Sequence, residues 1–225
     1  VVLQVFEDIL GLGGFADAEE SAVREAVRNC LQPEMKRHQI DMDWRDALTT
    51  SIALSLTQPL ALQADTGIPT CRLLAIEHAR LTCELPFLLR LRLTGTATES
   101  DAFVAAFEGS TQAWIRQYAD RVRGMSVSGL RGFLVGFIDL VFEHGGRWFI
   151  LDYKTNNLGP TRGDYSGDRL RQSMIEHDYI LQYHLYAVAL DAFLRLRLPG
   201  YRYDDHFGGV IYLFVRAVRP DAESL

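Results

Sequence analysis

The stretch FLVGFIDLVFEHGGRWFILDYK, residues 133–154, contains the features that decide the fold. Residues 133–142 and 148–151 are apolar on both faces, which is typical of neighbouring strands in the middle of a covered sheet. The Gly145-Gly146 pair between them favours a two-residue hairpin loop, because such loops need positive φ. We therefore expect a tight antiparallel hairpin at the centre of the molecule.

The expected register of this hairpin brings charged side chains together. Pairing across the two-residue turn places Asp139 directly opposite Asp152, with Cβ atoms roughly 5 Å apart. Lys154 lies two residues beyond Asp152, so it shares that face and is expected opposite Phe137. Two acids and a lysine are thus predicted to meet inside the sheet.

Two carboxylates in such a place need a compensating charge. At 5 Å they repel each other by roughly 3 kcal/mol at an effective dielectric constant of 20, and burial adds a desolvation cost. Two carboxylates and one lysine leave a charge of −1, and a divalent cation would bring the site to +1. Oxygen ligands with open positions suit Mg²⁺ or Mn²⁺ rather than zinc. The alternative is a structural Asp–Lys ion pair with Asp139 bonded to the backbone.

The rest of the chain reads as helices first, and then as helices alternating with strands. Apolar spacing indicates helices over residues 2–10, 17–31, 44–56, 101–107, 111–122 and 168–196. Short apolar runs indicate further strands over residues 72–76, 81–93 and 209–215. This order predicts an α/β core with a helical preface. We expect one domain over residues 1–225, with a helical subdomain over 1–70 and an α/β catalytic core over 71–218.

The composition is that of a globular protein. The 225 residues carry 23 Lys and Arg against 29 Asp and Glu, a net charge of −6, and 48% are hydrophobic, which excludes a disordered chain. No apolar run approaches the ~20 residues of a membrane span, and no signal peptide is visible. Three cysteines without zinc or disulfide spacing fit free thiols in a reducing cytoplasm. The start at Val1 instead of methionine favours a piece of a longer protein, and the acidic balance argues mildly against an independent nucleic-acid binder.

Three segments carry a family resemblance. They are Gly136-Phe137-Ile138-Asp139, Leu151-Asp152-Tyr153-Lys154-Thr155-Asn156 and Gln182-Tyr183-His184-Leu185-Tyr186. They resemble the PD-(D/E)XK nucleases, in particular the RecB-like branch, and the closing stretch 206–214 is also similar. The resemblance implies a restriction-endonuclease-like core, in which helices flank a central mixed β-sheet, with an N-terminal helical portion.

The resemblance also implies a role for each residue around the acidic pair. Asp139 and Asp152 would bind the catalytic metal, Mg²⁺ or Mn²⁺, together with the main-chain carbonyl of Tyr153. Lys154 would orient or activate the attacking water and offset charge in the transition state.

Gln182 and Tyr186 carry the Q-x-x-x-Y motif of the family, and the resemblance implies that they bind substrate. They lie four residues apart on one face of a predicted helix, in an otherwise apolar stripe. From the spacing alone, Gln182 is either a satisfied core residue or one that lines the site.

The implied function is that of the nuclease domain of a RecBCD-type helicase-nuclease. Such a domain is a cytoplasmic, Mg-dependent exodeoxyribonuclease that degrades single strands produced by unwinding during double-strand break repair. The implied partners are single-stranded DNA, the rest of a RecB helicase chain, the RecC and RecD subunits and RecA, without a membrane. Neither a P-loop nor a G-x-S-x-G motif is present in the sequence, which argues against nucleotide or serine hydrolysis.

One position departs from the family pattern. The family has a metal-reaching histidine three residues before a Phe-Glu-Asp motif in its first helix, and counting back from Phe6 puts Leu3 there. A leucine cannot ligate a metal, so Gln4 or water would replace the histidine, or the metal would be held more weakly. Leu3 keeps a second hypothesis open, a catalytically weakened docking module for recombinase loading or subunit contact, although the retained acids and lysine argue against it. A free-standing relative that acts on other DNA ends is a third.

Overall fold

A four-stranded sheet forms the centre of the computed structural model, which describes residues 1–60, 62, 70–92, 97–125 and 131–218. The strands lie in the order β1 (Leu81–Arg92), β2 (Arg131–His144), β3 (Arg147–Lys154) and β4 (Phe207–Phe214). The pairs β1–β2 and β2–β3 are antiparallel, whereas β3 and β4 run parallel. The sheet is therefore mixed, as the family resemblance implied.

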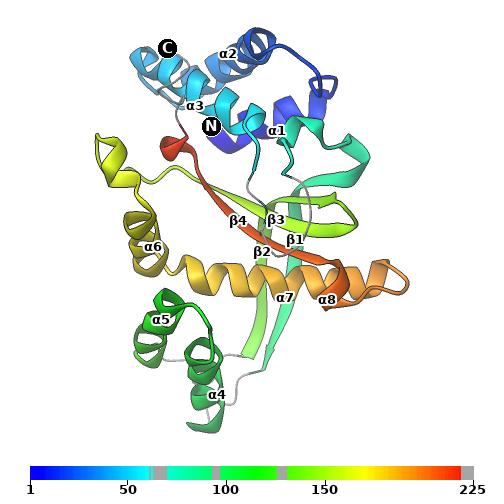
Figure 1. Ribbon diagram of the computed structural model, residues 1–225, viewed down its shortest axis with the longest axis vertical. Helices are drawn as coiled ribbons and strands as arrows, with labels where there is room; N and C mark the ends of the chain where they lie inside the picture. Colours follow the sequence, from blue (N-terminus) through cyan, green and yellow to red (C-terminus); the bar gives the residue numbers. More distant parts are fainter. Residues whose placement is uncertain (61, 63–69, 93–96, 126–130, 219–225) are drawn as a thin grey trace.

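Helices cover both faces of this sheet (Figure 1). One layer is formed by α1 (Val2–Leu12), α2 (Glu20–Arg37) and α3 (Arg45–Thr57), and α7 (Tyr179–Arg197) crosses the opposite face. The remaining helices are α4 (Ala97–Glu108), α5 (Ala113–Arg123), α6 (Gly167–Glu176) and the short α8 (Tyr203–His206). None of the described helices is both long and apolar enough to cross a membrane. The predicted α/β fold with a helical N-terminal portion is confirmed.

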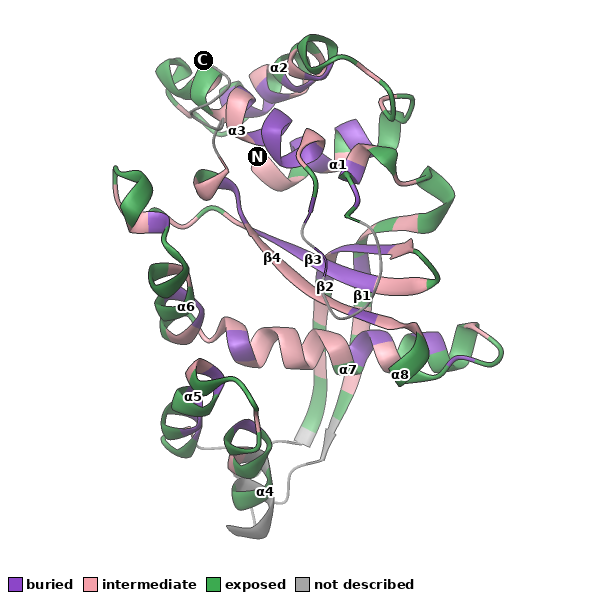
Figure 2. Cartoon of the chain, viewed as in Figure 1, coloured by how far each residue is buried: buried purple, intermediate pink, exposed green. Residues whose placement is uncertain are grey.

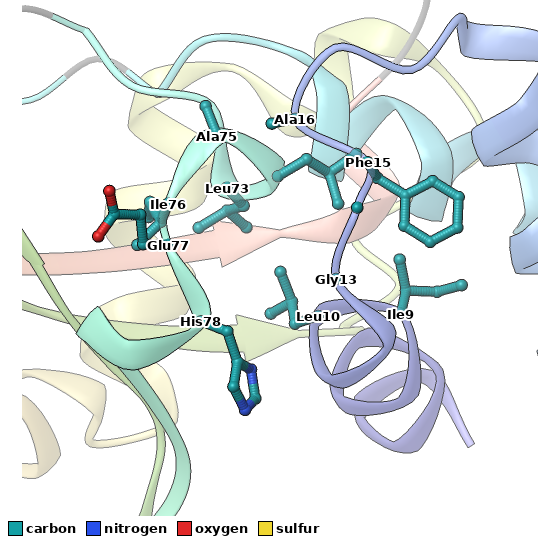
Figure 3. A pocket seen from close by; sticks show the side chains of 12 residues that line it. Ile9, Leu10, Gly13, Phe15, Ala16, Leu73, Ala75, Ile76, Glu77 and His78 are labelled. Atoms are coloured by element: carbon teal, nitrogen blue, oxygen red, sulfur yellow. The ribbon is translucent and has the colours of Figure 1, made fainter.

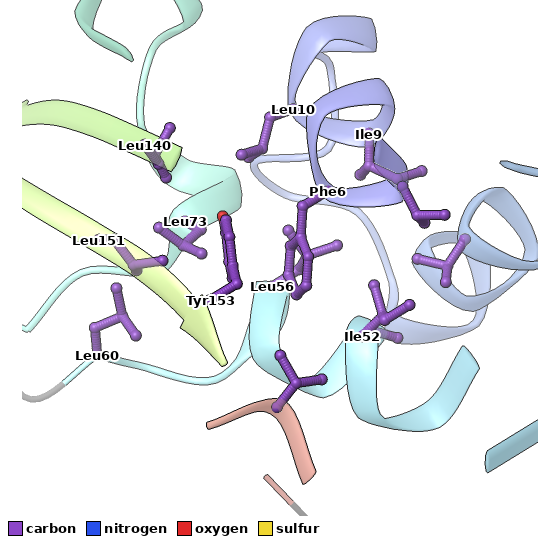
Figure 4. Close-up of a cluster of buried hydrophobic side chains, with 14 of the residues drawn as sticks. Phe6, Ile9, Leu10, Ile52, Leu56, Leu60, Leu73, Leu140, Leu151 and Tyr153 are labelled. Atoms are coloured by element: carbon purple, nitrogen blue, oxygen red, sulfur yellow. The ribbon is translucent and has the colours of Figure 1, made fainter. Parts of the chain in front are cut away.

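The largest core cluster joins the N-terminal helices to β2 and β3 (Figures 2 and 4). Phe6 of α1 stacks on Tyr153 of β3, with ring centroids 4.1 Å apart. Burial of such a side chain contributes about 1.5–3 kcal/mol. This contact fixes α1 against the strand that carries Asp152 and Lys154. The predicted subdomain boundary, between residues 70 and 71, directly follows residues 63–69, which lie outside the described part of the chain.

The β2–β3 turn has the predicted register as far as the pairing extends. His144 pairs with Arg147 across the glycines, and the ladder continues to Leu140 and Leu151. The two turn glycines, Gly145 and Gly146, have φ of 59° and 79°, the positive values that favour glycine.

Beyond that point the two strands separate. β2 continues with β1 as a two-stranded ribbon, while β3 continues with β4, where Lys154 pairs with Phe214. The hairpin ladder thus ends before it reaches either predicted pair, Asp139 with Asp152 or Phe137 with Lys154. The prediction that these residues lie directly opposite each other is not confirmed, and Lys154 pairs with β4 instead.

The alternation of side chains between the two faces of the β1–β2 ribbon is interrupted at Glu84. Cys83 packs against the cluster on the side of α1–α3, whereas Leu85, two residues later, packs on the side of α7. Residues two apart share a face in a regular strand, but Glu84 has φ of 48°, which is uncommon for a non-glycine residue. Asp139 lies opposite this irregular position.

Two other predictions differ from the structure. The run at residues 72–76 is not a strand: Leu73–Ala75 form a 3₁₀ helix, η3, whose Leu73 is fully buried. The helix predicted over residues 168–196 is divided into α6 and α7, because Asp178 adopts a left-handed conformation with φ of 57°. Short apolar runs do not distinguish strands from other buried segments.

A pocket of about 190 Å³ opens between the C-terminal end of α1 and η3 (Figure 3). Its lining is mostly apolar and includes Ile9, Leu10 and Phe15. None of the predicted site residues lines it, so it is separate from the acidic pair.

Candidate active site

Asp152 and Lys154 form a buried ion pair at the end of β3. Lys154 Nζ lies 2.5 Å from Asp152 Oδ2, and the side chains are 11% and 2% exposed. They are two residues apart on one strand and so point to the same side of the sheet. Carboxylates and ammonium groups are almost never buried to this extent without a partner.

Asp139 reaches the same place from β2. Its Oδ2 accepts a hydrogen bond of 3.0 Å from the main-chain N–H of Tyr153, just beyond the last β2–β3 pair. Burial raises the pKa of Asp139, while the Tyr153 hydrogen bond and the charge of Lys154 lower it in part. Burial, and then the charge of Asp139, raise the pKa of Asp152 to about 6. The structure thus brings the two acids and the lysine together.

Two more carboxylates, to which the sequence analysis gave no role, lie near this group. Glu84 of β1 is opposite Asp139, and its charge raises the pKa of Asp139. Glu7 of α1 has a pKa raised by burial and by the charges of Glu84, Asp8 and Asp139. Its Oε1 atom is buried and has no hydrogen-bond partner among the described residues. The site therefore has more negative charge than Lys154 can offset.

The start of α1 has Leu3 at the position of the expected histidine. Leu3 is partly buried and packs against the large core cluster. Gln4 donates a hydrogen bond of 3.0 Å to Asp8 on the exposed side of the helix. One turn after Leu3, Glu7 is the α1 residue that interacts with the acidic group. In the sequence, the only indication of this role of Glu7 was its place as a charged residue beside the apolar stripe of the first helix.

Gln182 of α7 lines the site rather than the core. Its Oε1 accepts hydrogen bonds from Lys154 Nζ at 2.9 Å and from the Tyr212 hydroxyl at 3.0 Å. Its Nε2 donates to the Tyr186 hydroxyl at 2.8 Å. Of the two possibilities left by the spacing, the structure thus selects the residue that lines the site, and both motif residues contact the group around Lys154.

Gly136 explains how Tyr186 is held in place. The Phe87 ring lies over this glycine, since a Cβ added there would stand 2.6 Å from Phe87 Cζ. Phe87 in turn packs edge-on against Tyr186, with ring centroids 5.6 Å apart. A glycine at this position therefore lets an aromatic ring reach the residue that supports Gln182.

Gly136→Ala is expected to destabilise the protein by about 1–3 kcal/mol, because the new methyl group overpacks the site of the Phe87 ring. Activity should fall as well, since Tyr186 and Gln182 lose their support. Urea denaturation measures the first effect. Gly11→Ala is the matched control, because nothing lies within 4 Å of its Cβ and the position is helical. It should be neutral or stabilising, and an equal loss in both variants would contradict the explanation.

The donor set fits a hard divalent cation. Buried carboxylates with raised pKa values and the unpartnered Glu7 Oε1 mark a lack of positive charge. Within the described part of the chain, no three His, Cys, Asp or Glu side chains form a ready-made ligand cluster. Mg²⁺ is commonly held by one or two carboxylates, with water and substrate phosphate as its other ligands. The acidic pair meets that requirement, whereas zinc sites in proteins usually include nitrogen or sulfur ligands.

A family comparison agrees with this chemistry. The model of the PD-(D/E)XK nuclease superfamily matches residues 3–223. The chain belongs to this superfamily. The PD-(D/E)XK assignment makes the chain a nuclease by family, and the Asp152-Tyr153-Lys154 segment has the D-x-K spacing for which the family is named.

The relatives of this PD-(D/E)XK chain include RecBCD enzyme subunits RecB. The subunit from Escherichia coli (strain K12) is 35% identical over 190 residues, which cover 84% of this chain and 15% of the relative. The subunit from Mycobacterium tuberculosis (strain CDC 1551 / Oshkosh) is 48% identical over 104 residues, 45% of this chain and 10% of the relative. The subunit from Haemophilus influenzae is 41% identical over 95 residues, which cover 42% of this chain and 8% of the relative. The chain thus spans no more than 15% of the length of these relatives.

Proposed function

We propose that this chain is the nuclease domain of a RecBCD-type helicase-nuclease. In the cytoplasm, together with the helicase part of RecB, with RecC and RecD and with RecA, it would degrade single strands released by unwinding at double-strand breaks. The observation that carries the proposal is the meeting of Asp139, Asp152 and Lys154 at one site. The similarity to RecB subunits gives the biological context.

The site residues have distinct tasks in the proposed reaction. Asp139, Asp152 and the main-chain carbonyl of Tyr153 would hold Mg²⁺ or Mn²⁺. When bound, the cation would supply positive charge to the phosphodiester group and promote ionisation of the attacking water. Lys154, held by Asp152 and Gln182, offsets the negative charge that develops on the phosphate and positions the water. Partial burial strengthens these interactions, because the local dielectric constant is low.

The part of the β1–β2 ribbon that extends beyond the β2–β3 ladder favours the proposal that the substrate is single-stranded. Phe133, Val135 and Phe137 of β2 are 64%, 66% and 55% exposed, and Leu88 of β1 is 62% exposed. They approach Asp139 along the strand. Aromatic side chains of this kind stack on unpaired bases, and each stacked base contributes about 1–3 kcal/mol. A base-paired strand could not offer its bases to these rings.

The double substitution Phe133→Ala and Phe137→Ala is therefore expected to weaken binding of single-stranded DNA by about tenfold or more. Fluorescence anisotropy with a labelled oligonucleotide in Ca²⁺, a cation chosen to limit cleavage, measures this affinity. Tyr203→Ala, which removes an exposed ring from α8, is the control. Unchanged affinity of the double variant would remove this support for a single-stranded substrate.

The proposed activity is tested by degradation of end-labelled single-stranded DNA with and without Mg²⁺, with Asp152→Ala as the control. Cleavage that depends on the cation and on Asp152 is the expected result. Cleavage that survives the substitution would point to another site, and no cleavage at any metal concentration would favour the docking module. A closed circular strand of the same sequence tests the proposed exonuclease mode, which predicts that the circle resists degradation.

A further inference from the structure

Lys154 has an aromatic neighbour that the motifs do not include. Its Nζ atom lies 4.0 Å from the ring centroid of Tyr179, and 5.1 Å from that of Tyr212. An ammonium group at this distance from a ring is attracted by the negative face of the π system. The ammonium group is therefore surrounded by the Asp152 carboxylate, the Gln182 amide oxygen and aromatic rings.

Tyr179 is itself fixed by several contacts. Its hydroxyl donates a hydrogen bond of 3.1 Å to Asn156 Oδ1, and its main-chain carbonyl accepts one of 3.2 Å from the Tyr212 hydroxyl. The His177 ring stacks on the Tyr179 ring, with ring centroids 5.3 Å apart and an interplanar angle of 17°. Because Asn156 follows Lys154 by two residues, one short segment supplies both the ammonium group and the anchor of its neighbouring ring.

The start of α7 also holds Tyr179 from the outside. The residue before it, Asp178, accepts hydrogen bonds from Arg121 at 2.5 and 2.9 Å and from the Tyr118 hydroxyl at 2.9 Å. These bonds tie the left-handed turn between α6 and α7 to α5. The position of the ring is thus set by three separate segments of the chain.

The choice of lysine at position 154 fits this arrangement. Of the 23 Lys and Arg residues, two are lysines, Lys36 and Lys154. A compact ammonium group can contact the face of a ring and two oxygen atoms at once, whereas a planar guanidinium group needs more room and a different geometry.

We propose that Tyr179 is a positioning residue for Lys154, and that Asn156 anchors it. The role rests on the proposed nuclease function, since it is the lysine that acts on the phosphodiester group. Without the ring, the ion pair with Asp152 remains but the ammonium group gains freedom to move away from the reacting phosphate. The turnover number should then fall, while KM for DNA stays near its original value.

Three variants test this role. Tyr179→Leu removes the ring, and Tyr179→Phe keeps the ring without its hydroxyl. Asn156→Ala removes the acceptor of that hydroxyl together with the contact between Asn156 and His177. We expect kcat to fall about tenfold or more in Tyr179→Leu, because small displacements of catalytic groups have effects of this size. Tyr179→Phe and Asn156→Ala both keep the ring and lose its hydrogen bond, so both should stay within about threefold of the original kcat. Tyr203→Leu, on α8, is the matched control and should not change kcat.

A second measurement reports on the contact without DNA or metal. The proton NMR signals of the lysine ε-CH₂ groups come from two residues, Lys36 and Lys154. Lys36→Arg removes one of the two signals and so assigns the other to Lys154, and Lys36 is exposed and not part of the site. The Tyr179 ring should shift the Lys154 signal upfield. That shift should persist in Tyr179→Phe and become clearly smaller in Tyr179→Leu, where the more distant Tyr212 ring remains, while thermal melting shows that each variant is folded.

The outcomes separate the two proposals. Absence of the upfield shift in the original protein, or an unchanged kcat in Tyr179→Leu, would overturn the positioning role. An original protein that shows the shift but cleaves no DNA would refute the proposed nuclease function and leave the ring contact standing.

Discussion

Asp152→Asn is expected to abolish DNA cleavage and at the same time to stabilise the metal-free protein. The loss of cleavage should be on the order of 10³-fold, since a metal ligand and a partner of Lys154 disappear together. The gain in stability follows from the pKa of Asp152, which burial and the charge of Asp139 raise to about 6 from an ordinary 3.8. At neutral pH the ionised carboxylate therefore opposes folding, by about 2–3 kcal/mol.

The pH dependence of unfolding has a definite sign. The folded state holds the Asp152 proton more tightly than the unfolded state does, so this group lowers stability as the pH rises from about 4 to about 6. Urea denaturation in EDTA should show that decline in the original protein and a smaller one in Asp152→Asn. The exposed Asp168→Asn is the control. If the asparagine variant were less stable than the original at pH 7, the excess of negative charge at the site would be disproved.

Lys154→Met should act in the opposite direction on stability. It leaves the carboxylates of Asp139 and Asp152 in place without their ammonium partner, and loss of one member of a buried ion pair costs about 3–5 kcal/mol. Cleavage should fall by at least about 10²-fold, because the charge that offsets the phosphate is gone. Thermal denaturation in EDTA and a single-turnover cleavage assay measure the two effects.

Added Mg²⁺ distinguishes this explanation from a simple packing defect. A cation that binds the folded state restores stability in proportion to the logarithm of its concentration, so Lys154→Met should recover more than the original protein does. Lys36→Met replaces the exposed lysine of α2 and should change neither quantity. If Lys154→Met is destabilised and its stability does not increase with Mg²⁺, the loss comes from packing alone.

The central hairpin could be predicted because its determinants are local. The Gly145-Gly146 turn sets the register, and the register places Asp139 near Asp152. The position of Lys154 relative to Phe137 could not be predicted in the same way. It depends on where β2 leaves β3, and the separation occurs beside Glu84, whose left-handed backbone belongs to another strand.

The same reasoning explains the carboxylates that the sequence analysis did not assign. Glu7 comes near the acidic pair because Phe6 stacks on Tyr153, a contact between residues far apart in the chain. Asp178 divides the predicted long helix because its side chain bonds to Arg121 of α5. Helix periodicity contains neither piece of information, since both depend on tertiary contacts.

The position of Mn²⁺ in crystals of the protein, located by its anomalous scattering, tests the proposed metal site directly. We expect a peak within coordination distance of one carboxylate oxygen from each of Asp139 and Asp152, with the Tyr153 carbonyl as a third ligand. A protein that cleaves DNA at that Mn²⁺ concentration but shows no peak at this pair, or binds the ion elsewhere, would contradict it.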